Sequence, residues 1–189
     1  MSTTQTTPSE VLRERGRALV RRGSWRRLAL SAGAALAGTL LLFGLLFGVA
    51  AVHGDSMNPA FRGGDLVLFS RLGRNYRPGD VVILKAEVAQ RTGGTSIRKY
   101  LKRVVAVPGD AVDIGALGVF VNGAPLEQPY AQGRTERGQS VAFPLLLGEG
   151  EYFVLGDNRE SSDDSRSFGP ITAAHIEGKV LAALRTGRP

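Results

Sequence analysis

Twenty-five consecutive residues without a charge, from Leu28 to Val52, constrain this chain more than any other feature of its sequence. As an α-helix this run would extend about 37 Å at about 1.5 Å per residue, enough to cross a bilayer with some tilt. A cleaved signal peptide has an apolar core of only about 7–15 residues, although Gly48-Val49-Ala50 offers the small residues typical of a cleavage site. The length therefore favours a retained anchor, and we expect residues 28–52 to be a single transmembrane segment.

Charge is distributed unevenly around this run. Residues 1–27 carry seven arginines and two glutamates, a net charge of +5 out of +7 for the whole chain. The remaining residues carry only +2, so a nucleic-acid partner is not expected. Positive charge beside a spanning segment tends to stay cytoplasmic. We therefore expect residues 1–27 to be a basic cytoplasmic tail and residues 53–189 an extracytoplasmic domain, in a single-pass protein of the plasma membrane.

The chain contains no cysteine and only two histidines, His53 and His175. Disulfides, thiol nucleophiles and iron–sulfur clusters are excluded by the first observation. A zinc site built from two histidines is not expected, because zinc usually has three or four protein ligands. We expect neither a metal nor a cofactor.

The residues after Gly54 have the pattern of a β domain, with short apolar runs separated by Gly, Pro, Asn and Asp. Asn122-Gly123 is a strong signal for a two-residue hairpin turn. The polar stretches 86–97 and 131–140 are expected to be mobile loops between paired strands, and residues 171–184 fit either a last strand or a short helix. The predicted strands are Asp65–Phe69, Asp80–Leu84, Lys99–Val107, Val112–Ile114, Val119–Val121 and Tyr152–Leu155.

Lys102 lies in an apolar row of one predicted strand, because strand alternation puts it on the same face as Tyr100, Val104 and Ala106. A lysine in such a row must find a partner, reach the sheet edge, or lose its proton, since desolvation lowers the pKa of an amine. On this strand alone, the commoner arrangement has the stem covering the sheet and the ammonium in water. We expect that arrangement for Lys99 and Arg103.

Ser56 lies in the turn Gly54-Asp55-Ser56-Met57-Asn58-Pro59, which by itself is an ordinary Ser/Asn/Pro turn. A serine nucleophile needs a base, but His53 adjoins the apolar run and His175 lies in an apolar tail typical of packing. A neutral, desolvated lysine is the other known partner for serine. A third polar segment, residues 156–169, follows a strand and is either a solvated loop or a hydrogen-bonded scaffold beside a site.

Four segments together resemble the successive conserved boxes of bacterial type I signal peptidases, the leader peptidases. In family order these are GDSMNPAF, GDLVLF, KYLKRVVAVPGD and GDNRESSDDSRSFGPI. The resemblance extends from about residue 31 to residue 171. It implies a mainly β fold: one transmembrane helix, then a coiled β-sheet catalytic domain with a small variable β insertion within about residues 109–150.

The resemblance also implies roles for individual residues. The family's nucleophile falls on Ser56 and its general-base lysine on Lys102, and we expect the backbone N–H of Ser56 to be one oxyanion-hole donor. The serine that bonds the lysine amine in the family falls on Ser162. Supporting roles are implied for the scaffold pair Asp164 and Arg166, and for Asp157 and Asn158 at the opening of the last box.

Three positions depart from the family pattern. Gly54 stands where many relatives have a serine whose hydroxyl helps the oxyanion hole. Ala60-Phe61 and Ala106 replace a common Thr-Leu and a common glycine, and these changes should affect only packing. Because the motif accepts serine at position 54, we expect the turn to tolerate a Cβ and Gly54→Ser to keep or raise turnover.

The implied function is a membrane-anchored serine endopeptidase that removes signal peptides from exported preproteins through an acyl-enzyme. Its partners would be the lipid bilayer and signal peptides with small residues at the first and third positions before the cut. Two alternatives remain. A self-cleaving Ser–Lys repressor would need a DNA-binding domain, and a non-catalytic membrane-tethered β binding module would have no reason to keep Ser56, Lys102 and Ser162 together.

Overall fold

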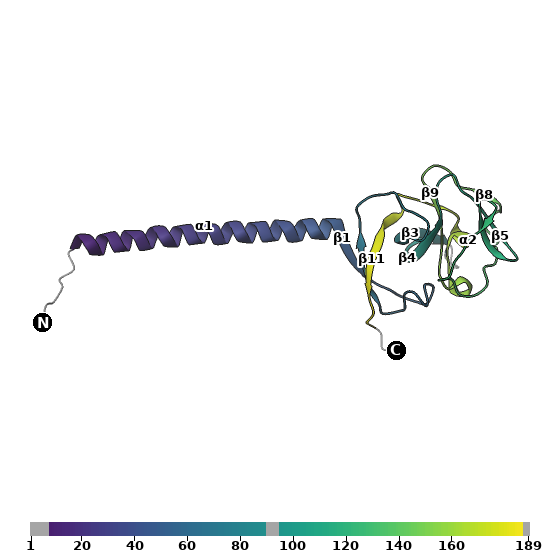
Figure 1. Ribbon diagram of the computed structural model, residues 1–189, viewed down its shortest axis with the longest axis horizontal. Coiled ribbons are helices and arrows are strands. Elements are labelled where there is room, and N and C mark those ends of the chain that lie inside the picture. Colours follow the sequence, from purple (N-terminus) through teal and green to yellow (C-terminus); the bar gives the residue numbers. More distant parts are fainter. Residues whose placement is uncertain (1–7, 90–94, 187–189) are drawn as a thin grey trace. The chain divides into compact units, whose positions relative to one another are not determined.

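The computed structural model describes residues 8–89 and 95–186, and the chain divides after Leu45 into two compact units. The helices are α1 (Pro8–Leu46), the short 3₁₀ helix η1 (Arg159–Ser161) and α2 (Ser165–Phe168) (Figure 1). The strands are β1 (Phe47–Ala51), β2 (Leu66–Ser70), β3 (Val81–Ala89), β4 (Thr95–Ala106), β5 (Ala111–Gly115), β6 (Gly118–Val121), β7 (Ala124–Pro125), β8 (Leu145–Leu146), β9 (Glu151–Leu155), β10 (Ile171–Thr172) and β11 (Ile176–Leu184). The predicted mainly β fold is confirmed.

Helix α1 contains one stretch long and apolar enough to cross a membrane, Trp25–Leu46, with a mean hydropathy of 2.0. Its 22 residues extend about 33 Å at about 1.5 Å per residue. The helix ends at Leu46, so the prediction of a transmembrane helix over residues 28–52 is wrong for residues 47–52. Residues 47–51 instead form β1, whose backbone groups pair with β2 from Phe47↔Ser70 to Ala51↔Leu66, replacing the hydrogen bonds that a helix would make internally.

The larger sheet has seven strands in the order β1-β2-β11-β3-β4-β9-β10, and its neighbouring strands are antiparallel. Strands β3 and β4 pair as far as Ala89↔Thr95, so the predicted loop at residues 86–97 is wrong outside the undescribed residues 90–94. Cross-strand pairing satisfies the polar backbone there despite the weak apolar pattern. The open question about residues 171–184 is answered by β10 and β11, whereas residues 131–140 hold only an isolated bridge at Gln132.

The smaller sheet, ordered β7-β6-β5-β8, lies within the predicted insertion range. Asn122 and Gly123 turn the chain between β6 and β7 with φ angles of 52° and 79°, as the two-residue hairpin signal predicts. One hydrophobic cluster, including Val112, Ile114 and Phe153, joins this sheet to β9.

A second apolar cluster underlies the β1–β2 end of the larger sheet. It contains Val52, Val67, Phe69 and Ile83, all less than a tenth exposed. The loop between β1 and β2 closes over its own base through backbone hydrogen bonds from Val52 to Asp65 (2.8 Å) and from Gly64 to Val52 (2.9 Å). This loop carries Ser56.

Candidate active site

Ser56 is held in place by the last polar segment of the chain. The backbone N–H of Asn158 donates to the carbonyl of Ser56 at 3.0 Å, and Asn158 Nδ2 donates to the carbonyl of Asp55 at 3.2 Å. On the other side Met57 is 1% exposed and anchors the loop in the core. Asn158 thus ties together two segments a hundred residues apart.

Lys102 lies opposite Val82 in the β3–β4 ladder and is 1% exposed. Its Nζ lies 2.7 Å from Ser56 Oγ, and it donates to the carbonyl of Leu101 at 3.1 Å. Burial lowers the pKa of Lys102 from 10.5 to about 8, against the opposing pull of Asp164, Asp163 and Asp157. The amine is therefore neutral in about a tenth of molecules at pH 7, far more than for an ordinary lysine, and a neutral amine can accept the serine proton.

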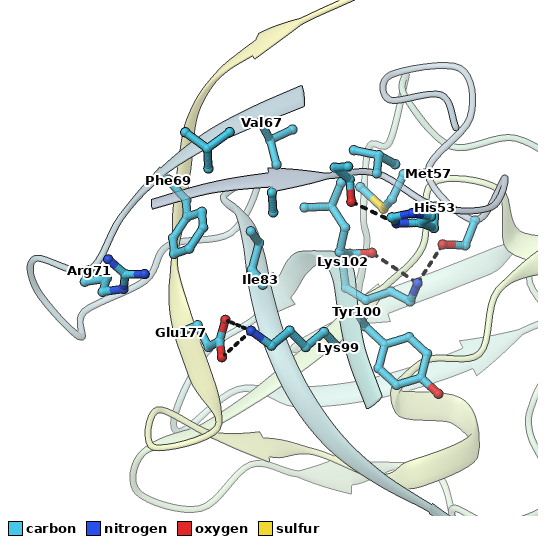
Figure 2. Close-up of a pocket in the computed structure, with 16 residues that line it drawn as sticks. His53, Met57, Val67, Phe69, Arg71, Ile83, Lys99, Tyr100, Lys102 and Glu177 are labelled. Carbon is cyan, nitrogen blue, oxygen red and sulfur yellow. Dashed lines mark hydrogen bonds and ion pairs between the residues drawn. The ribbon is translucent and has the colours of Figure 1, made fainter. Parts of the chain in front are cut away.

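A cavity of about 590 Å³ opens beside this pair, and Figure 2 shows Lys102 and His53 at one end of it and Arg71 at the other. Two strand edges that no neighbouring strand covers, among the described residues, border the cavity. Within the described residues β1 pairs only with β2, and β9 joins β4 only from Arg103 onward, which leaves Lys99–Lys102 unpaired on that side. The lining residues are Val49, Ala50, Ala51, Val52, His53, Ser56, Met57, Val67, Phe69, Arg71, Ile83, Lys99, Tyr100, Leu101, Lys102 and Glu177.

Asp164 and Arg166 form a buried scaffold behind the serine loop. Asp164 caps α2 by accepting a hydrogen bond from the backbone N–H of Arg166. Its carboxylate also accepts hydrogen bonds from Nε (2.8 Å) and Nη2 (2.9 Å) of that arginine. The same carboxylate accepts from the N–H of Gly156 at 3.0 Å, and Arg166 Nη2 reaches the carbonyl of Arg159 at 2.7 Å. Every one of these bonds restrains the segment that holds Ser56.

Asp157 is fully buried and pairs with Arg103, which accounts for its place in the motif. Arg103 donates through Nε (2.8 Å) and Nη2 (2.6 Å), and its guanidinium lies 4.1 Å from the ring centre of Tyr130. The prediction of a solvated Arg103 is therefore wrong, because a buried carboxylate requires a cation. Burial opposes the charge on Arg103, but the bonds from Asp157 outweigh it and raise the arginine pKa.

Sequence reasoning also missed Arg159, which is 3% exposed. Its guanidinium donates to the carbonyl of Gly156 at 3.0 Å, to Thr135 Oγ1 at 2.7 Å, and to Gln128 Oε1. Arg159 therefore connects the serine-holding segment to the loop at residues 128–135. The only signal was its position inside a polar stretch that follows a buried strand.

Among the described residues, no hydrogen bond joins Ser162 to Lys102. Ser162 Oγ is buried and has no hydrogen-bond partner within residues 8–89 and 95–186. It lies against Gly156, where an added Cβ would collide with Ser162 Oγ and with the carbonyl of Ser56. The Ser162–Lys102 hydrogen bond that the family resemblance implies therefore stays a prediction, although Ser162 is adjacent to the serine loop.

Tyr100 places an aromatic ring beside Lys102, on the face of the strand that the alternation pattern predicts for both residues. Its ring centre lies 5.3 Å from Lys102 Nζ, and its hydroxyl donates to Asp163 Oδ2 at 3.0 Å. Burial and that hydrogen bond raise the pKa of Tyr100 to about 12, so it stays neutral beside the lysine.

The two histidines differ in position. His53 lines the cavity and its Nδ1 lies 3.1 Å from the carbonyl of Ala51. His175 is exposed and bonds Thr172 Oγ1 at 3.0 Å, so the expected packing of His175 is wrong. Within residues 8–89 and 95–186, no group of three or more acidic or histidine side chains is arranged to hold a metal ion.

Gly54 has a φ of 77°, a conformation that favours glycine, although a Cβ would meet no atom within 4 Å. This finding contradicts the expectation that the turn tolerates a Cβ. Because a side chain in that region costs about 1–2 kcal/mol, we expect Gly54→Ala and Gly54→Ser each to lower kcat/KM about tenfold. Gly54→Asn should be least harmful, since asparagine tolerates this region best. Steady-state kinetics on the three variants tests this, and turnover by Gly54→Ser at or above the unsubstituted level would contradict it.

Comparison with known proteins identifies the family. Residues 25–184 match the family model of signal peptidase, peptidase S26. Signal peptidase I P of Bacillus subtilis subsp. natto is 30% identical over 150 residues, covering 74% of this chain and 77% of that protein. Signal peptidase IB of Staphylococcus aureus is 33% identical over 147 residues, covering 68% and 73%. A solved signal peptidase I from Enterococcus faecalis is 29% identical, covers 57% of this chain and 97% of its own, and has a TM-score of 0.42. The chain therefore belongs to the type I signal peptidases of peptidase family S26.

Proposed function

We propose that this membrane protein cleaves signal peptides from exported preproteins with Ser56 as nucleophile and Lys102 as general base. The observation that carries the proposal is the 2.7 Å contact between Ser56 Oγ and a lysine amine that is 1% exposed, in a chain of the signal peptidase family. Nothing in the described residues favours a repressor or a binding module.

The chemistry follows from this contact. Neutral Lys102 takes the hydroxyl proton as Ser56 Oγ attacks the carbonyl carbon of the scissile bond, and then gives that proton to the leaving amine. The resulting ester joins Ser56 to the signal peptide. Water attacks this ester with Lys102 again accepting a proton, which releases the signal peptide with a free carboxyl group and restores the serine.

The backbone N–H of Ser56 is proposed as one oxyanion-hole donor. Supporting this, the carbonyl of Ser56 is engaged by Asn158, whereas its N–H has no acceptor among the residues that the structure describes. A fixed donor of this kind is worth about 2.7–4 kcal/mol in the transition state. The scaffold of Asp157, Asn158, Asp164 and Arg166 is proposed to keep that N–H in place.

The cavity supports an extended substrate. A peptide strand lying between β1 and β4, on the sides where no described strand pairs with them, could pair with main chain on both sides, as in other strand-addition complexes. Beneath the strand, Met57, Leu101, Val67 and Ile83 leave apolar space of limited size. We propose that the residues before the cut occupy this cavity and that its size selects small side chains there.

The experiment that tests the proposal uses the full chain in a neutral detergent. Incubation with a purified preprotein should yield the mature product with the expected new N-terminus, identified by mass spectrometry. The Ser56→Ala variant, prepared identically, should yield none. Failure of the unsubstituted protein to cut, or equal cutting by both proteins, would contradict the proposal.

The proposed orientation places residues 1–27 in the cytoplasm and the β unit outside. The basic segment before the span supports it. An exposed apolar face on β1, β2 and β11 supports a lipid partner for the β unit: Val49, Leu66 and Leu184 are 67%, 37% and 65% exposed, and register places them on one side of the sheet.

We expect protease added outside intact spheroplasts to digest the β unit. Immunoblotting with antibodies to the two ends of the chain measures this. A β unit that is digested only after lysis would reverse the orientation.

A further inference from the structure

The cavity has two chemically different ends, and only one of them takes part in the chemistry. At one end lie Ser56 and Lys102. At the other, Lys99 pairs with Glu177 and Arg71 also lines the cavity, and Figure 2 shows the Lys99–Glu177 contact well away from Lys102. We propose that this charged end binds an acidic side chain at the fifth residue before the cut. The inference rests on the proposed function.

The charged end is net positive. Glu177 accepts from Lys85 at 2.9 Å and from Lys99 at 3.0 Å, and although burial works against it, these two bonds lower the pKa of Glu177. The group is therefore a carboxylate with one negative charge, against three positive charges on Lys85, Lys99 and Arg71. A net charge of +2 remains.

Exposure decides which of these groups a substrate meets. The side chain of Lys99 is 64% exposed, whereas that of Glu177 is only 19% exposed behind its two lysines. Arg71 donates to the carbonyl of Phe47 and lies 5.1 Å over the ring of Phe69, which fixes its guanidinium at the cavity wall. A ligand that enters this end therefore meets fixed or exposed cations before it meets the carboxylate.

Strand geometry sets the position that reaches this end. Alternate side chains of an extended peptide point the same way and are about 6.6–6.8 Å apart. Figure 2 shows the lining change along the cavity, with Met57 and Lys102 near the nucleophile, then the apolar Ile83, then Lys99 and Glu177. If the first residue before the cut occupies the zone beside the nucleophile and the third residue occupies the apolar zone, the fifth residue reaches the charged zone.

The net positive charge of this end of the cavity determines which class of substrate side chain it binds. An aspartate or glutamate at the fifth position gains from the two cations, a neutral polar residue gains little, and a lysine is repelled. Each exposed ion pair changes binding by about 1.4- to 5-fold. With two cations we expect a preference of about five- to tenfold for Asp over Lys.

The test uses the full chain in neutral detergent with three peptides that differ only in having Asp, Asn or Lys at the fifth residue before the cut. We expect kcat/KM in the order Asp, Asn, Lys, with a ratio that shrinks as salt is raised. Lys99→Met should remove most of the preference, and Glu177→Gln should increase it. Lys179→Met is the matched control, because Lys179 pairs with Asp80 (2.7 Å) on the same sheet but does not line the cavity.

Each outcome separates the two proposals. Cleavage of all three peptides at equal rates, or a preference that survives Lys99→Met, would overturn the acidic subsite and leave the protease function standing. Cleavage of none of the peptides would overturn both. Binding of the labelled peptides to the Ser56→Ala variant, followed by fluorescence anisotropy, should show the same order without turnover.

Discussion

Replacing Lys102 by methionine is expected to lower kcat/KM for preprotein cleavage by at least about 10⁴-fold. Methionine keeps the length and apolar character of the buried stem but has no amine to accept the proton of Ser56, 2.7 Å away. Ser56→Ala should cause a loss of similar size, and the double variant should lose little more, because the two groups act as one unit. Cleavage rates measured with a single preprotein decide this.

Two controls make the result interpretable. Lys179→Met removes an ion-paired lysine elsewhere on the same sheet and should leave kcat/KM within about twofold of the unsubstituted rate, since exposed pairs contribute little. Lys102→Met itself should be folded, because it exchanges a buried amine for an apolar group. A Lys102→Met protein that is folded and retains a tenth or more of the activity would exclude Lys102 as the base.

Activity is expected to fall about tenfold per pH unit below pH 8, so that kcat/KM at pH 6 is about a hundredth of its plateau. The reason is the pKa of Lys102, which burial lowers from 10.5 to about 8, so that acid protonates the proposed base. His53 also lines the cavity, and His53→Gln tests its contribution. A pH–rate profile for both proteins should show the same acid limb, and a limb that moves in His53→Gln would contradict its assignment to Lys102.

The same lowered pKa has a definite sign for stability. Between about pH 8 and 10.5 the unfolded chain binds the proton and the folded chain does not, so stability rises with pH across that range. Below pH 8 the full penalty is present, about 3 kcal/mol for a shift of this size. Lys102→Met should therefore be more stable than the parent at pH 7, by up to about 3 kcal/mol, and should lose this advantage near pH 11. Denaturant unfolding in detergent at the two pH values measures the difference.

The strands of this protein were largely predictable from the chain because their signals are local. Apolar alternation located β2, the core of β4 and β9, and Asn122-Gly123 marked a turn that needs positive φ angles at both residues. The parts of the β3–β4 hairpin beyond Leu84 and before Lys99 were not predictable. Their strand structure depends on pairing with each other, because the apolar alternation of each segment is weak. β1 was not predictable either, because it is the last part of an apolar run typical of a membrane helix and is a strand only through its pairing with β2.

The sequence by itself determined the family, the two residues proposed to react and the order of the segments that carry them, because these depend on residue identity and spacing. Only the tertiary structure decided which groups touch. It paired Arg103 with Asp157, joined Arg159 to Thr135, and left Ser162 Oγ beside Gly156 with no hydrogen bond to Lys102 among the described residues. It also set the conformation of Gly54. Contacts between residues tens of positions apart depend on how the sheet brings their segments together. These contacts bury Lys102 and thereby lower its pKa, an effect that no single segment encodes.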